Sequence, residues 1–370
     1  MLSERQLQSL LQVFQSRFQG VTDEYLQMVG SHIARVKKLS QDDIHLLVEF
    51  RTCKLNQSVI RQKIANAARM SVSDIEKIFR HVAETDMEFA SQYYGAGVSD
   101  AIKREINSTL PTAIEAILKA QLRVTAGTML NLSQTTAVSQ NYQKAISEAV
   151  QLAQTGVEDY NTAIRRAARK ASSEGLRVQY ESGRTRRLDT AVRQNVLDGV
   201  RSLNQDVMRQ CGNAYGADGV EISAHMLCAL DHVDYQGRIF TQKEFDHLQT
   251  VELERPIGRW NCKHIAMPVI IGISEPAYSD DELSAYKRYS EHQISIDGKT
   301  LPRYEWEQER RRIETSVRYS NDSIKLLSAS GDTVGVQLEE SKIEGLKSRY
   351  ESITRICGFD DDSRRMENII

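Results

Sequence analysis

Residues 7–18, LQSLLQVFQSRF, carry an apolar side chain at every third or fourth position. That spacing gathers the apolar groups on one face of an α-helix, which can then be buried against a neighbour. A second stripe of the same period runs from Tyr25 to Val36, and Gly20 separates the two. We therefore expect two amphipathic helices with a break near Gly20. Because Pro111 is the only proline before residue 256, most of the first 170 residues should also be helical.

Four positions before residue 140 carry signals for helix ends. Ser40 and Ser71 each precede an aspartate by three residues, and this pairing can satisfy the free amides of a helix N-terminus. We expect helices to begin at both serines. Residues 93–97, YYGAG, and the surroundings of Pro111 should interrupt the helical pattern.

The pattern changes after about residue 215. Three short segments, 219–225, 237–241 and 267–273, are apolar or alternating and are bounded by Gly or Pro, so they predict β-strands. Residues 294–301 enclose Asp297-Gly298, a pair that favours a tight hairpin turn.

Two further helices are predicted near the C-terminus, over residues 305–317 and 341–356. The fold class is therefore α+β and mostly α. We expect a long helical N-terminal region over residues 1–171, a small mixed α/β His/Cys module over 172–290, and a hairpin with a helical C-terminal extension over 291–370.

Bulk composition limits the partners and the compartment. The chain has 48 basic and 50 acidic residues, a formal charge of −2, so contact with nucleic acid must rest on local charge. Residues 1–5 show no secretory signal pattern, and no apolar run approaches the roughly 20 residues that span a bilayer. Five scattered cysteines fit reduced thiols. We expect a protein made in a cytosol, without membrane contact.

Potential metal ligands gather in one window. The five candidates are His225, Cys228, His232, Cys262 and His264. Two close pairs separated by a loop are a common way to build a tetrahedral zinc site, and His225-x-x-Cys228 with Cys262-x-His264 supplies four ligands, with His232 competing. Three alternatives stay open: a structural zinc ion, buried side chains held by hydrogen bonds alone, or a catalytic metal.

A catalytic alternative is an HNH-like nuclease. Asp231-His232, Asn261 and His264 follow the order in which such nucleases place a base and metal ligands. The residues after His232 differ from the expected loop, and Asn261 stands only three positions before His264. No Gly-rich phosphate loop, Gly-x-Ser-x-Gly elbow or His-Glu-x-x-His helix is present, so we expect no enzyme.

Residues 165–193 contain nine basic and three acidic side chains. The candidates for contact with nucleic acid or a protein partner are Arg177, Arg184, Arg186, Arg187 and Arg193. Guanidinium groups can bind DNA phosphate or an acidic protein surface. The alternative is a pair of solvated, salt-bridged helices.

Several segments, taken in order, resemble the phage minor capsid protein 2 family. They are residues 180–187, YESGRTRR, residues 222–225, ISAH, residues 236–240, QGRIF, and residues 261–264, NCKH. Weaker similarity covers about the whole chain. The central module also looks like a distant version of the Mu F-type head-protein domain, in which His225 and Cys228 would occupy the first ligand pair and Cys262 and His264 the second. Relatives differ from this chain around residues 227–230, so the resemblance makes Cys228 the least secure ligand and favours His225, His232, Cys262 and His264.

The resemblance implies a structural protein of a tailed-phage head, without established enzymatic activity. It implies a virion location in the capsid interior or at the portal vertex, with the portal protein and the major capsid protein as partners. The expected role is head assembly or genome packaging and ejection, after synthesis in the host cytoplasm. Contact with packaged DNA, homo-oligomer formation in the virion and a bound zinc ion stay open. The alternatives are the nuclease acting on phage DNA and a scaffold that leaves before maturation.

Overall fold

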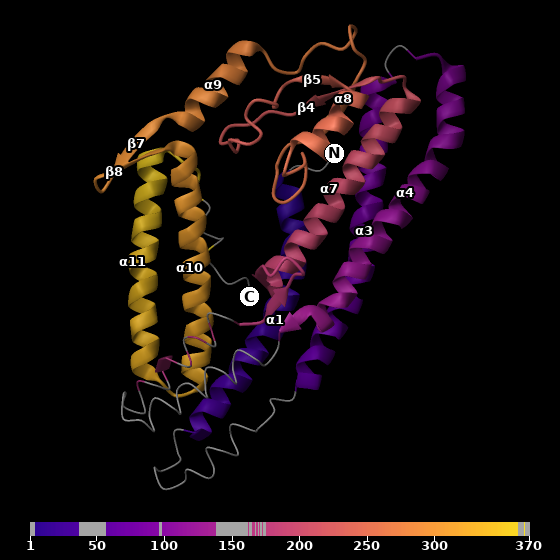
Figure 1. The fold of residues 1–370 in the computed structure, drawn as a ribbon. Helices are drawn as coiled ribbons and strands as arrows, with labels where there is room; N and C mark the ends of the chain where they lie inside the picture. Colours follow the sequence, from indigo (N-terminus) through magenta and orange to yellow (C-terminus); the bar gives the residue numbers. More distant parts are fainter. Residues whose placement is uncertain are drawn as a thin grey trace. The chain divides into compact units, whose positions relative to one another are not determined.

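The computed structural model describes residues 4–36, 57–95, 98–137 and 175–361, with seven single residues. The seven are Thr162, Arg165, Arg166, Ala168, Lys170, Ser172 and Met366. Long helices dominate the described part, and its strands form three small antiparallel sheets (Figure 1). The prediction of an α+β, mostly α protein is confirmed.

The chain divides into two compact units, each assembled from segments far apart in the sequence. Unit 1 consists of Met1–Gln12, Met70–Met129 and Arg193–Glu307, and unit 2 consists of Val13–Arg69, Leu130–Val192 and Gln308–Ile370. These units group residues that are close in space, whereas the three predicted segments group residues with similar sequence patterns. The three-segment division therefore stays a prediction.

The first helix, α1, runs from Glu4 to Val36 without interruption, so the predicted break near Gly20 is wrong. Gly20 lacks a positive φ and is exposed. A glycine inside a helix costs about 1 kcal/mol relative to alanine, whereas burying one large apolar side chain gains about 1.5–3 kcal/mol. Buried Phe18 and Tyr25 on either side of Gly20 outweigh its cost.

Helix α3, Gln57–Tyr94, passes through Ser71, so the predicted N-terminus at that serine is wrong. Ser71 is buried between Ala68 and Ile75 on the apolar stripe of the helix, and the stripe continues across it. The predicted interruption after Tyr93 is confirmed, because α3 ends at Tyr94. The predicted start at Ser40 lies outside the described residues.

Helix α4, Asp100–Thr135, contains Pro111 in its interior, so the break predicted there is also wrong. An interior proline costs about 3 kcal/mol. Ile106, Leu110, Ile114 and Leu118 follow one another at four-residue steps and are all buried. Each gains about 1.5–3 kcal/mol, so the stripe outweighs the lost hydrogen bond, and the proline ring stays on the exposed side.

In unit 1, helix α7, Leu188–Ala214, packs closely on α3 and α4, and the three lie side by side in Figure 1. A Cβ atom added at Gly199 would lie 3.0 Å from the ring of Phe79 and closer still to Thr125. The Asn204 side chain donates to Asp86 at 2.7 Å. Small and polar side chains therefore let α7 approach both neighbours.

The three predicted strands are confirmed, each shorter than predicted, and they form an antiparallel sheet after α7. Strand β4, Gly219–Ile222, lies between β5, Ile239–Thr241, and β6, Ala266–Val269. Its small core consists of Val220, Ile222, Phe245, Leu248, Ile257 and Ala266. Helix α8, Gln242–His247, starts with a Thr241–Glu244 capping box and continues into the π-helical turn η2, Leu248–Glu252.

The predicted hairpin is confirmed after helix α9, Asp280–Glu291. Strands β7, Gln293–Ile296, and β8, Lys299–Pro302, pair antiparallel. The φ angles of Asp297 and Gly298 are 50° and 77°, the conformation that a two-residue hairpin turn requires.

Unit 2 contains a sheet that the sequence did not predict. Strands β1, Thr136–Ala137, β2, Arg177–Gln179, and β3, Thr185–Arg187, pair in that order. Their brevity and their many charged residues hide the alternating apolar pattern of a strand.

Both C-terminal helices are longer than predicted. Helix α10 covers Arg303–Ala329, and α11 covers Thr333–Cys357 rather than starting at Ser341. Asp332 caps α11 by accepting from the Gly335 amide. Arg310 of α10 donates to the Tyr350 hydroxyl of α11 at 2.6 Å, and the two helices run side by side (Figure 1).

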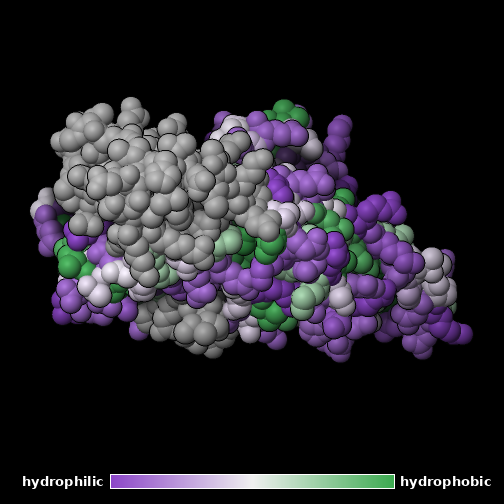
Figure 2. Space-filling model, turned by 90° about the horizontal axis from the view of Figure 1, so that it is seen from below, coloured by the Kyte–Doolittle hydropathy of each residue, from purple (hydrophilic) through white to green (hydrophobic). Residues whose placement is uncertain are grey.

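None of the helices in the described segments is both long and apolar enough to cross a bilayer. On the face drawn in Figure 2, the coloured residues are mostly hydrophilic, and the hydrophobic ones form small separate groups.

The continuity of α1 can be tested with two substitutions in one helix. Gly20→Ala should raise the free energy of unfolding by about 0.5–1 kcal/mol, because it restricts the unfolded chain and nothing described lies within 4 Å of the added methyl. Gly30→Ala should lower it by about 1–3 kcal/mol, because its Cβ would lie 2.5 Å from the Ala329 Cβ. Urea denaturation measures both, and a Gly20→Ala variant less stable than the parent would contradict a continuous helix.

Candidate metal centre

His232 lies in the turns between β4 and β5. Its backbone N–H donates to the Ala229 carbonyl at 3.0 Å, and its carbonyl accepts from the Tyr235 amide at 3.0 Å. The side chain is fully buried, and ring Nε2 lies 2.7 Å from the Arg255 carbonyl oxygen. Because that oxygen can only accept, Nε2 carries the hydrogen and Nδ1 keeps a free lone pair.

The other two cluster residues follow a loop that side chains fasten at its start. Arg255 donates to both carboxylate oxygens of Asp231, at 2.9 and 2.6 Å. The Gln249 amide both donates to and accepts from the backbone of Ile257, at 3.2 and 2.6 Å. The buried Ile257 side chain anchors the same loop in the small core.

Helix α7 holds the end of this loop. The Trp260 amide donates to Asp198 at 3.1 Å, and the Arg201 guanidinium donates to the Cys262 carbonyl. The Cys262 amide donates to the Arg259 carbonyl at 2.9 Å, which closes a tight turn. The position of Cys262 is therefore set by backbone contacts that do not involve its thiol.

His264 comes two residues before β6, whose pairing with β4 fixes its direction. The Ser223 amide donates to the Ile265 carbonyl at 2.9 Å, and the Ile265 amide donates to the Ser223 hydroxyl at 2.8 Å. The sheet thus continues by one residue on each side and turns the His264 ring inward.

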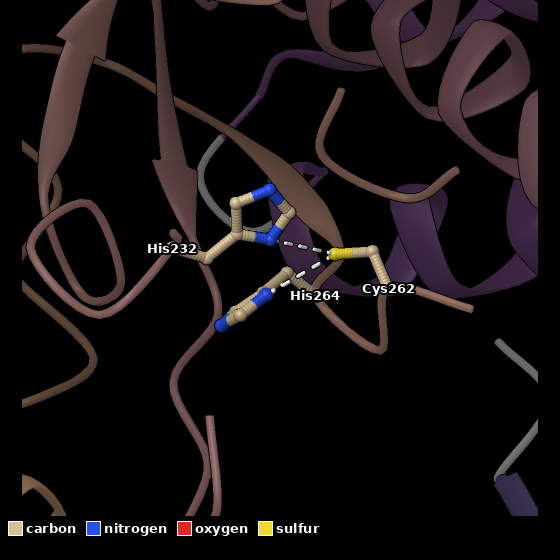
Figure 3. A group of neighbouring side chains, drawn as sticks. All are labelled: His232, Cys262 and His264. Atoms are coloured by element: carbon tan, nitrogen blue, oxygen red, sulfur yellow. Dashed lines mark hydrogen bonds between the residues drawn. The ribbon is translucent and has the colours of Figure 1, made fainter. Parts of the chain in front are cut away.

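Three potential ligand atoms converge at this point. The Cys262 Sγ atom lies 3.3 Å from His232 Nδ1 and 3.2 Å from His264 Nδ1. All three atoms lie within 4.8 Å of one another. Figure 3 shows both rings directed at the sulfur. The three residues are 0%, 2% and 3% exposed, so the cluster is enclosed by protein.

The hydrogens available do not satisfy this arrangement on their own. His264 Nε2 lies 3.4 Å from the Gln236 Oε1 atom, an acceptor, and 3.4 Å from the Cys228 sulfur, which donates its own hydrogen to the Ala229 carbonyl. A hydrogen on Nε2 suits both neighbours, and both rings then direct a bare Nδ1 at Cys262. A thiol has one hydrogen and can donate to only one of the two nitrogens. A cation bound by the thiolate would occupy all three groups at once. Two imidazole nitrogens and one thiolate are a ligand set that zinc prefers.

Burial sets the protonation of the cluster. Burial, together with a smaller effect of neighbouring His225 and His232, lowers the pKa of His264 to about 3. Burial also lowers the pKa of His232 and raises that of Cys262. Both imidazoles are therefore neutral near pH 7, as metal ligands must be, whereas forming the thiolate requires a compensating cation.

The structure brings all five predicted ligands into one neighbourhood, but His225 and Cys228 do not join the three converging atoms. The Cys228 Sγ atom lies 3.4 Å from His264 Nε2, on the other side of that ring. The His225 ring packs on the His264 ring with centroids 4.5 Å apart, and its Nδ1 lies 2.8 Å from the Met226 carbonyl. The convergent set therefore contains His232, which the paired spacing had made only a competitor.

The five predicted contact arginines lie in different environments. Arg184 is exposed at the turn between β2 and β3, and Arg186 lies over the Tyr180 ring at 6.0 Å. Arg177 donates to the Tyr319 hydroxyl at 2.9 Å, and Arg193 donates to Gln8 at 2.7 Å. The hairpin turn thus leaves Arg184 and Arg186 most open to an outside anion.

Arg187 is buried in unit 2 and is fully engaged there. It donates to Asp189 at 3.0 Å, to Gln19 at 3.0 Å and to Asp322. Burial lowers the pKa of Arg187, but the two carboxylates outweigh it and raise the pKa overall. The positive charge is balanced inside the protein, so its role here is to hold α1, β3 and α10 together.

Sequence reasoning missed the residues that position the cluster. Asp198, Arg201, Gln236 and Arg255 act through backbone groups or second ring nitrogens. None stands at a ligand-like spacing, and the bonds of Asp198 and Arg201 form only once α7 packs beside the loop. A sequence pattern carries no signal for them.

A family model described as phage minor capsid protein 2 matches residues 2–351. The class of protein is thus a structural component of a phage capsid, with a virion location. The chain belongs to the phage minor capsid protein 2 family. No curated protein and no solved structure matches it.

The buried cluster predicts a dependence of stability on pH. The His264 pKa of about 3 lies below its unfolded value of about 6.5, so the unfolded chain binds the extra proton between these values. This histidine should leave the free energy of unfolding unchanged above about pH 6.5. Below that pH it should lower the free energy of unfolding as the pH falls towards 3, by up to about 1.4 kcal/mol per pH unit. Urea denaturation of metal-free protein at a series of pH values measures it.

Two variants separate His264 from the acidic groups that titrate in the same range. His264→Gln should flatten this part of the curve, whereas His247→Gln, at an exposed histidine, should leave it unchanged. A His264→Gln curve parallel to that of the parent protein would contradict the prediction.

Proposed function

We propose that this protein is a minor head protein at the portal vertex of a tailed phage, acting in head assembly or in genome packaging and ejection. Family membership over residues 2–351 is the observation that supports this role. The proposed partners are the portal protein and the major capsid protein. A homo-oligomer in the virion is a further possibility under the same proposal.

The helices offer positions on which partner helices can dock. Val334 and Leu338 are exposed one turn apart on α11. Met70 on α3 and Val124 on α4 are each exposed as well. An exposed apolar position on a long helix can pack against an amphipathic partner, and assembly of a head requires such contacts.

For the basic hairpin, we propose contact with packaged DNA or with an acidic face of the portal protein. Arg184 is exposed there, and Arg186 is partly exposed beside Tyr180. Because guanidinium groups bind phosphate and carboxylate alike, geometry supports an anionic partner of either kind.

For the candidate metal centre, we propose a structural zinc ion held by His232, Cys262 and His264. Zinc would supply the positive charge that a buried Cys262 thiolate needs. It would also connect the loop after β4 to the loop before β6, on a sheet whose core has only six buried side chains.

The HNH-like nuclease is the second candidate, and the geometry gives it less support. His232 is enclosed, and its Nε2 is already bonded to the Arg255 carbonyl. Asn261 is exposed on a tight turn beside Trp260, apart from the buried ligand atoms. A general base must reach a water molecule beside the scissile phosphate, which a fully buried ring does not.

A single substitution tests the zinc proposal. Cys262→Ser should abolish zinc binding and lower the free energy of unfolding by several kcal/mol, because the metal stabilises only the folded state. Elemental analysis of purified, tag-free protein and thermal denaturation measure the two effects.

Cys211→Ser is the matched control, because Cys211 is equally buried on α7 but lies outside the cluster. It should retain zinc. An equal loss of stability in both variants, with no zinc in the parent protein, would contradict the proposal. The same sample should not cleave DNA with divalent ions; cleavage abolished by His232→Ala would favour the nuclease instead.

The portal-vertex proposal predicts a defined set of neighbours. Cross-linking and mass spectrometry of purified mature particles should detect this protein in fewer copies than the major capsid protein, with cross-links from α11 to the portal protein. Leu338→Glu should reduce its incorporation, because a buried unpaired charge opposes helix docking.

Lys347→Glu, at an exposed position nine residues further along α11, is the control for a change of charge alone. Absence from mature particles would support a scaffold that leaves before maturation. Cross-links to the major capsid protein far from the portal would contradict the vertex position.

A further inference from the structure

The turn at residues 259–262 has an unusual residue at its tip. The φ angles of Trp260 and Asn261 are 49° and 67°, and the Cys262 amide donates to the Arg259 carbonyl at 2.9 Å. Two consecutive positive φ angles are typical of a type I′ turn, in which Asn and Gly are the favoured residues. A bulky aromatic residue with positive φ is a clear outlier. Such an outlier is a reason to look for a function.

Two side chains of α7 bind the backbone of this turn. Asp198 of α7 accepts from the Trp260 amide at 3.1 Å, and Arg201 binds the Cys262 carbonyl. The Trp260 side chain is nevertheless 55% exposed. Its ring makes no ring contact with any other residue in the described segments. The fold thus fixes the backbone of this tip and leaves the indole in solvent.

Apart from Asp198, whose carboxylate accepts from the Trp260 amide, the charged side chains of this turn are basic. Residues 255–264, RPIGRWNCKH, contain three basic and no acidic side chains. Arg255 is paired with Asp231, as described above. Arg259 and Lys263 are exposed and form no ion pair within the part of the chain that the structure describes. One indole therefore stands in the sequence between two cations that no carboxylate of the described segments pairs with.

We propose that this tip, Arg259, Trp260 and Lys263, binds single-stranded nucleic acid. Trp260 would stack on a base while Arg259 and Lys263 bind the flanking phosphates, the combination that single-strand binding sites use. A duplex hides its base faces, so the single strand is the preferred ligand. This site is separate from the Arg184–Arg186 hairpin and does not depend on the portal-vertex proposal.

A protein partner fits the tip less well. Protein hot spots place Trp in a patch whose surrounding contacts exclude water. Arg259, Asn261 and Lys263, the exposed neighbours of Trp260 in this turn, are all polar or charged. A polyanion with flat apolar groups, which is what a nucleic-acid strand provides, matches both the charges and the ring.

The two tryptophans of the chain make the binding directly measurable. Trp306 is 1% exposed and its indole N–H donates to the Ile294 carbonyl, so added ligand cannot reach it. Titration of the full chain with an oligothymidylate of about 16 nucleotides should quench the emission of Trp260. The quenching should weaken as salt is added, and a duplex of equal length should quench less.

Substitutions at the tip separate stacking from charge. Trp260→Asn should weaken binding of a labelled oligothymidylate at least about fivefold, because one stacked base is lost. Its melting temperature should be equal or higher, since Asn suits the turn, so misfolding cannot explain the loss. Arg259→Ala with Lys263→Ala should reduce the slope of log affinity against log salt by about 1.4.

Lys243→Ala is the matched control, a single exposed cation on α8 in the same unit. It should change the salt slope by less than half as much and leave the quenching intact. The inference is overturned if the oligonucleotide does not quench Trp260, if Trp260→Asn binds it as well as the parent, or if duplex quenches equally. Loss of protein cross-links from Trp260→Asn particles, without oligonucleotide binding, would assign the tip to a protein partner.

Discussion

Cys262 meets His232 and His264 because the chain reverses immediately before it, at two residues with positive φ. That reversal is maintained by Asp198 and Arg201 of α7, and it has consequences on both sides of the backbone. Inward, it brings a thiol between two imidazoles. Outward, it exposes Trp260 between two cations. The interior cluster and the exposed tip therefore share one structural support, and a change in the packing of α7 beside the turn would affect both.

Desolvation determines what the interior cluster can be. Burial keeps both imidazoles neutral and disfavours the thiolate. The Nδ1 atoms of His232 and His264 both face the Cys262 thiol, which has one hydrogen to donate. A zinc ion bound there would resolve this conflict and would connect two loops of a sheet with a small core. Such a link would help the module to keep its shape.

A different specific contact fixes the packing in each of the two units. In unit 1, close approach of α7 at Gly199 positions the helix that supports the metal centre. In unit 2, the buried Arg187 binds nearby Asp189 and also Asp322, and the second bond joins strand β3 to helix α10, which is remote in sequence. A buried ion pair is weak evidence for stability, but it does impose a specific arrangement, because removing one partner leaves a charge in the interior.

The N-terminal and C-terminal helices, the three central strands, the Asp297-Gly298 hairpin and the gathering of His and Cys residues could be predicted from the sequence, because periodicity, turn residues and ligand spacing are local properties. Helices α7 and α9 were not predicted. The continuity of α1, α3 and α4 through Gly20, Ser71 and Pro111 could not be predicted, because burial of the apolar stripe on either side outweighs each local signal. Nor could the position of His225 outside the three converging atoms, or the engagement of Arg187 inside unit 2. The sequence by itself determined which residues were available for a metal centre and for anion contact. Only the tertiary structure decided which atoms converge and which charges face solvent, because those outcomes depend on long-range packing and desolvation.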